Sequence, residues 1–178
     1  MISTEEYIQL KAFARQDGLF IGLLWIFTLG CFAGSMWAPE VEIGFIAGIV
    51  TSPFLIYFRL RDFRNKALGG YISYRRAVAY CLMTTTCASI LLAAATLVYF
   101  YLIDDGMLMN TLYRNISVPE IRESFKQMQM DPDLLEAQIA EIGKLRPIDF
   151  AFSIFFNCIV SSAILSLILG LIGMRKKR

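Results

Sequence analysis

"AVAYCLMTTTCASILLAAATLVYFYL", residues 77–102, contains no charged side chain and decides the fold class. A helix needs about 20 apolar residues to cross the hydrocarbon core of a bilayer. Three further runs of this kind lie at about 19–37, 41–60 and 148–174. The chain of 178 residues is 57% hydrophobic with a mean hydropathy of +0.56, too apolar for a soluble domain of this length. The sequence predicts an all-α integral membrane protein with four transmembrane helices, forming a single membrane domain over 1–178.

The first apolar run has a second interpretation, a cleaved signal peptide. The run is longer than the 7–15 apolar residues that are typical of such a signal, and residues 1–18 carry no excess of basic side chains. Pro39 lies where small residues would mark a cleavage site. We therefore expect this run to remain as a transmembrane helix.

The distribution of basic residues predicts the orientation. The loop between the second and third runs is strongly basic, and the chain ends in "RKKR". Acids outnumber bases between residues 103 and 149. Because lysine and arginine are retained on the cytoplasmic side, we expect both termini and the basic loop in the cytoplasm. Residues 103–147 are then external, in a multi-pass protein of a bacterial inner membrane.

The basic loop, "RDFRNKALGGYISYRRA" at residues 61–77, has two interpretations. The simpler one is a determinant of topology. In the other, the cations bind phosphate on anionic lipid headgroups. The candidate headgroup contacts are Arg61, Arg64, Lys66, Arg75 and Arg76. Gly69 and Gly70 predict a turn, and nucleotide binding is excluded because the lysine of a Walker A loop is missing.

The same region carries a family resemblance. "YFRLRDFRNKALGGYISYRRAVAY", residues 57–80, combines an arginine–aspartate pair with a Gly-Gly turn that opens a span. Together with "DGLFIGLLW" at residues 17–25, it resembles a family of small bacterial membrane proteins, the domain-of-unknown-function family numbered 4199, common in the Bacteroidota. The resemblance implies four spans and the inner membrane of a Gram-negative cell. It brings no catalytic residue and no ligand.

The residue types inside the apolar runs exclude several kinds of chemistry. The chain has no histidine, which removes imidazole bases, Ser-His-Asp triads and His-ligated metals. The four cysteines form no C-x-x-C pair and are typical of small buried hydrophobic residues. The interiors of the runs hold no charge, which disfavours an ion-driven transporter. We expect no enzyme activity, no cofactor and no metal.

Polar and small residues within the runs favour helix packing. Glycines four residues apart, in "GLFIG", "GCFAG" and "GFIAG", allow the backbones of two helices to approach closely. A candidate interhelical polar layer consists of Thr85, Asn157 and Ser161. Asn157 is the strongest candidate for a buried interhelical hydrogen bond, and a polar ligand site around it is the alternative.

The pattern of the external segment predicts a short helical hairpin, or a broken helix, before the last span. Ser117 and Glu120 have the spacing of a capping box, whereas Asp131 followed by Pro132 predicts a second helix start, with an end near Gly143. A segment this short cannot bury a core alone. Its apolar faces must contact the span ends, the membrane surface or a partner.

Two classes of function remain. The first is a non-catalytic inner-membrane protein, an accessory or scaffolding subunit of an envelope complex. The second is a carrier or binding protein for a lipid or small apolar solute, which would use the basic loop together with Thr85 and Asn157. The expected partners are membrane lipids and another membrane or envelope protein, with a homo-oligomer as a further option and no nucleic acid.

Overall fold

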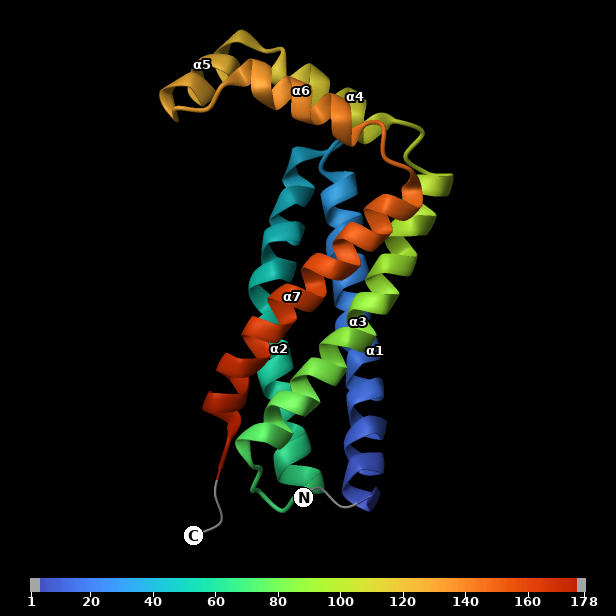
Figure 1. Cartoon of the computed structure of the whole chain (residues 1–178), viewed down its shortest axis with the longest axis vertical. Coiled ribbons are helices and arrows are strands. Elements are labelled where there is room, and N and C mark those ends of the chain that lie inside the picture. Colours follow the sequence, from blue (N-terminus) through green and yellow to red (C-terminus); the bar gives the residue numbers. More distant parts are fainter. Residues whose placement is uncertain (1–3, 176–178) are drawn as a thin grey trace. The chain divides into compact units, whose positions relative to one another are not determined.

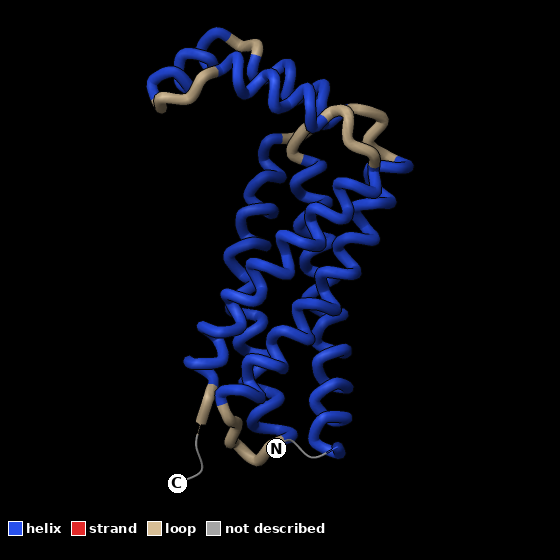
Figure 2. Tube along the Cα trace, in the orientation of Figure 1, coloured by secondary structure: helices blue, strands red, loops and turns tan. Residues whose placement is uncertain are grey.

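The computed structural model describes residues 4–175. Within them the backbone is helical and the helices are joined by loops (Figures 1 and 2). The elements are α1 (Thr4–Gly34), the short 3-10 helix η1 (Pro39–Val41), α2 (Glu42–Ala67), α3 (Tyr74–Leu102), α4 (Met107–Ile116), α5 (Pro119–Gln127), α6 (Pro132–Ile142) and α7 (Pro147–Gly173). All but the first residue of the basic tail "RKKR" lies outside the described residues.

Four of these helices, α1, α2, α3 and α7, are long and apolar enough to cross a membrane. This confirms the predicted fold class. The helices extend beyond the apolar runs, most of all in α1, which begins at Thr4 although the run begins at Leu19. At 31 residues, α1 rises about 46 Å and exceeds the hydrocarbon core, which is about 30 Å thick.

The chain forms two compact units. The first comprises residues 1–95 and 152–178, and the second comprises residues 96–151. Helices α3 and α7 contribute to both, so each unit is described by itself.

In the first unit, glycines bring helices together as the sequence predicted. A Cβ atom on Gly18 would lie 2.7 Å from Thr84 O of α3, and one on Gly22 would lie 2.7 Å from Leu91 Cδ1. On α2, Gly44 faces Cys31 of α1 in the same way, with 2.7 Å between the added Cβ and Sγ. Gly30 has open space instead, so only some of the glycine pairs serve close packing.

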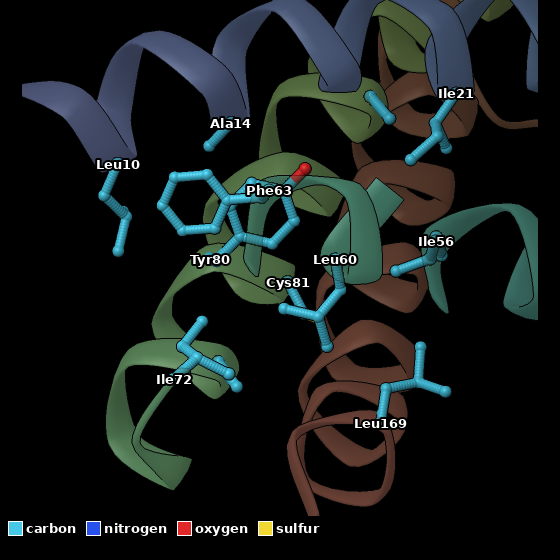
Figure 3. Packing of buried hydrophobic residues seen from close by; sticks show 12 residues of the cluster. Leu10, Ala14, Ile21, Ile56, Leu60, Phe63, Ile72, Tyr80, Cys81 and Leu169 are labelled. Atoms are coloured by element: carbon cyan, nitrogen blue, oxygen red, sulfur yellow. The ribbon is translucent and has the colours of Figure 1, made fainter. Parts of the chain in front are cut away.

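The apolar core of this unit draws on all four long helices (Figure 3). The rings of Phe63 from α2 and Tyr80 from α3 stack with centroids 4.6 Å apart. Leu10 and Ala14 of α1 pack beside them and are fully buried. These two residues precede the predicted span, so the early turns of α1 belong to the core.

The second unit holds three short helices where the sequence predicted two. Helix α4 was not predicted, and Ser117 ends it rather than starting α5, because its Oγ donates to Tyr113 O at 2.7 Å. The capping-box prediction at Ser117 is therefore wrong. The start of α6 is confirmed: Asp131 Oδ1 accepts from Asp133 N at 3.0 Å, Pro132 follows, and Gly143 ends the helix.

Ion pairs and rings hold the second unit together. Arg122 of α5 pairs with Asp133 and Glu136 of α6. Phe100 of α3 stacks on Phe150 of α7 with ring centroids 4.3 Å apart. Together these contacts join α5 to α6 and the end of α3 to the start of α7.

Candidate functional site: a buried acid in the helix bundle

Asp17 is a buried carboxylate that hydropathy does not place within the first span. It lies near the middle of α1 and is 7% exposed. Hydropathy places it in the segment before the first span, because the apolar run begins at Leu19. An ionisable side chain inside a membrane helix is costly and is a marker of function or of specific packing. Its partners therefore define the candidate site.

Asp17 is shared by two groups from two other helices. The hydroxyl of Tyr80, on α3, donates to Asp17 Oδ2. Arg59 Nη1, on α2, lies 3.5 Å from Asp17 Oδ1, and its guanidinium also lies 4.7 Å from the ring centroid of Phe20. We call Asp17, Arg59 and Tyr80 the Asp17 cluster. It links α1, α2 and α3 around one negative charge.

The Asp17 cluster lies at the end of the apolar spans that is flanked by basic side chains. Lys11 and Arg15 are exposed on the turns of α1 that precede Asp17. Exposed charges avoid the hydrocarbon core, although long side chains reach toward the headgroups. From Asp17 to the end of α1 at Gly34 the helix rises about 26 Å, close to the thickness of that core. The Arg59 side chain is 33% exposed, so the cluster has one polar edge.

A second pair lies one turn earlier on α3. Arg76 Nη1 bonds Glu6 Oε1 of α1 at 3.0 Å, and the Arg76 side chain is only 11% exposed. Its Nε and Nη2 atoms are buried without a hydrogen-bond partner among the described residues. Arg76 therefore joins α3 to α1 and is not presented to lipid headgroups on an open surface.

Two further cations of the basic loop, Arg64 and Lys66, also have partners within the chain. Arg64 Nη1 donates to Gly173 O at 2.9 Å, where α7 ends, and Lys66 pairs with Asp62 at 2.6 Å. Beside them, the backbones of Ile72 and Arg175 exchange two hydrogen bonds of 3.0 Å. We call these contacts between the loop and the end of α7 the C-terminal clasp. Of the five candidate headgroup contacts, Arg61, Lys66 and Arg75 are exposed.

The turn predicted at the two glycines is confirmed. Gly69 has φ +62° and Gly70 has φ +91°, both in the region that side chains with a Cβ rarely adopt. Gly70 N donates to Arg64 O at 2.9 Å and closes the end of α2.

The structure does not bring the predicted polar layer together. Thr85 is buried and its Oγ1 donates to Cys81 O at 2.9 Å, within its own helix. Asn157 and Ser161 are exposed on α7, and Asn157 Nδ2 donates to Ser153 O at 2.9 Å, also within its own helix. Ser153, Asn157 and Ser161 are spaced four residues apart, so they form one exposed line, which we call the α7 polar stripe.

Among the residues that the structure describes, no three cysteine, aspartate or glutamate side chains lie close enough together to hold a metal ion. All four cysteines are free thiols, and Cys31 and Cys81 are buried. The contacts of the Asp17 cluster are a hydrogen bond and a charge pair between helices.

A signal for Asp17 is present in the sequence, although hydropathy does not find it. Leu10, Ala14 and Gly18 are four residues apart, and they continue the buried face of the first span into the residues before it. That spacing is typical of one helix face. It places Asp17 next to Gly18, at the edge of a packed surface.

Comparison with known proteins adds a family. A family model described as "Protein of unknown function (DUF4199)" matches residues 16–175. The chain belongs to this family. The matched region of the DUF4199 family includes all three members of the Asp17 cluster and the α7 polar stripe. No curated protein and no solved structure matches the chain.

Proposed function

We propose that this DUF4199 protein is a non-catalytic accessory or scaffolding subunit of a bacterial inner-membrane complex, and that the α7 polar stripe binds a transmembrane helix of another protein. The observation that carries the proposal is the exposure of Asn157 on a strongly apolar span.

Asn157 lies well inside α7, with ten helical residues before it. Its amide has two donor hydrogens and an acceptor oxygen, and the described residues supply one partner, Ser153 O. Facing lipid tails, the remaining groups have nothing to bond, which is costly. A second transmembrane helix can supply partners, and the small side chains of Ser153 and Ser161 let its backbone approach.

The ionisable side chains of the bundle support a role without catalysis. Asp17 is held by Tyr80 and Arg59, and Arg76 is held by Glu6. Each pair joins two helices, and such pairing fixes helix positions.

The proposal is tested by gentle solubilisation of the tagged protein from its native host, followed by mass spectrometry of what copurifies. We expect a stoichiometric membrane-protein partner with the wild type, and its loss in Asn157→Leu, which keeps the side-chain size. Thr51→Val is the matched control, since Thr51 is an exposed polar residue on the α2 span.

Retention of the partner by Asn157→Leu would overturn the interface. Recovery of bound lipid without any protein partner would overturn the accessory role and favour a lipid carrier. Both variants are compared with wild type by thermal unfolding in detergent, so that a folding defect is recognised.

A further inference from the structure

A hollow of about 460 Å³ opens in the second unit, where α3 ends and α7 begins. Leu97, Val98 and Leu102 line it from α3, and Pro147 and Ile148 line it from the first turn of α7. Arg146 is its charged lining residue. We call this hollow the α3–α7 groove. Its volume lies in the range of about 300–1,000 Å³ that is typical of ligand pockets.

The charge beside the groove is a forked ion pair. Arg146 Nε lies 3.1 Å from Asp149 Oδ2, and Nη2 lies 3.1 Å from Oδ1. The backbone N of Arg146 also donates to Asp149 Oδ2 at 2.9 Å. The hydrogen bonds that Arg146 donates to the Asp149 carboxylate raise the pKa of Arg146, so the guanidinium keeps its charge. Both side chains keep accessible surface, 77% for Arg146 and 34% for Asp149.

The walls of the groove are held in place by their own contacts. Phe100 and Phe150 stack at an interplanar angle of 13° and tie the end of α3 to the start of α7. Tyr101, another lining residue, is 75% exposed. Tyrosine is enriched at the depth where lipid headgroups begin. The groove therefore lies at the boundary between acyl chains and headgroups, with its charge pair on the headgroup side.

We propose that the α3–α7 groove binds a phospholipid with a zwitterionic, primary-ammonium headgroup, phosphatidylethanolamine. One acyl chain lies against Leu97, Val98 and Ile148, which leaves the headgroup at Arg146. The guanidinium of Arg146 takes the phosphate, and Asp149 takes the ammonium. An anionic lipid such as phosphatidylglycerol finds the same cation, but Asp149 opposes its charge.

This site is separate from the interface of the proposed function. Asn157 lies in the first unit, whereas every residue of the groove lies in the second. Lipid retention and partner copurification can therefore fail independently.

The test uses the full-length protein in nanodiscs made of equal parts phosphatidylethanolamine and phosphatidylglycerol. After transfer to mild detergent and washing, native mass spectrometry counts each lipid that is retained. We expect phosphatidylethanolamine to be retained preferentially. Arg146→Gln should lower its retention about threefold, the effect of one exposed charge pair. Lys144→Gln is the matched control, because Lys144 is an exposed cation that does not line the groove.

Two further variants separate the groove from the charge pair. Val98→Trp fills the groove and should lower retention of both lipids, whereas Ile90→Trp, on the exposed surface of the same helix, should not. Asp149→Asn keeps a side-chain acceptor for the Arg146 backbone N–H in the first turn of α7 but removes the negative charge, so the preference for phosphatidylethanolamine should disappear. Equal retention of the two lipids by wild type, or unchanged retention in Val98→Trp, would overturn the proposal.

Discussion

Asp17 shows how one residue can alter the interpretation of a membrane helix. A carboxylate buried without a partner would destabilise the bundle. The Asp17 carboxylate instead accepts a hydrogen bond from the Tyr80 hydroxyl and lies beside the Arg59 guanidinium. The three members come from α1, α2 and α3, and the contacts of Asp17 join its helix to the other two. The Asp17 cluster therefore specifies how three helices meet, and both Tyr80 and Arg59 depend on Asp17.

The first prediction follows from that dependence. Asp17→Ala leaves Tyr80 and Arg59 without their shared acceptor and should lower the free energy of unfolding by about 1–3 kcal/mol, the lower part of the range for buried pairs because Arg59 is partly exposed. Asp17→Asn, which can still accept from Tyr80, should have a smaller effect. Unfolding by sodium dodecyl sulfate in mixed micelles measures both.

Asp62→Asn is the control for this experiment. Asp62 forms an ion pair with Lys66 in which the two side chains are 50% and 72% exposed, so its loss should not change stability measurably. An equal effect of Asp17→Ala and Asp62→Asn would contradict a structural role for the cluster.

At the scale of the element, the sequence predicts the four long helices but not their full extent. Hydropathy marks the segment that lipid surrounds, whereas the first turns of α1 are amphipathic and pack through Leu10 and Ala14. Helix α4 is not predicted from the sequence, because "MLMNTLYRNI" has neither an N-cap side chain nor a long apolar run. Asp131 was predictable because its cap is local, with acceptor and donor two residues apart.

The second prediction compares two glycines of α1. Gly18→Ala should lower the free energy of unfolding by about 1–3 kcal/mol, since the new Cβ would lie 2.7 Å from a backbone oxygen, Thr84 O, which cannot rotate away. Gly30→Ala should leave stability unchanged or raise it slightly, because nothing lies within 4 Å and alanine favours the helix. Equal effects in the same unfolding assay would contradict the close approach of α1 and α3.

The third prediction concerns the turn between α2 and α3. Gly69 has φ +62° and no atom near its missing Cβ, so Gly69→Ala should cost about 1 kcal/mol through backbone strain alone. Asparagine tolerates this conformation better, and Gly69→Asn should restore part of the loss. Asparagine no better than alanine would show that the turn changes its conformation in the variants.

At the scale of the whole molecule, the sequence predicts the fold class and an orientation in the membrane. The location of the sites depends on which face of each helix is turned toward lipid. Thr85 and Asn157 are both polar residues within apolar spans, yet one is buried and the other exposed. Periodicity cannot separate them, since helices so uniformly apolar carry little sign of which side faces the core. The clasp formed by Arg64 and Gly173 joins residues 109 positions apart, a contact that composition cannot predict.

The fourth prediction tests the orientation with two matched lysines. Lys66, in the basic loop, and Lys144, in the acidic segment, are 72% and 69% exposed, and each forms a local ion pair with a residue of its own segment. Each is changed to cysteine in a chain whose native cysteines, Cys31, Cys81, Cys87 and Cys158, are replaced by alanine. By the positive-inside rule, a membrane-impermeant maleimide should label Lys144→Cys in intact spheroplasts, and Lys66→Cys only after permeabilisation.

Cysteine labelling leaves the C-terminal clasp intact, whereas a reporter inserted beside Gly70 would disrupt it. Labelling of Lys66→Cys, but not Lys144→Cys, in intact spheroplasts would reverse the orientation and place both termini outside.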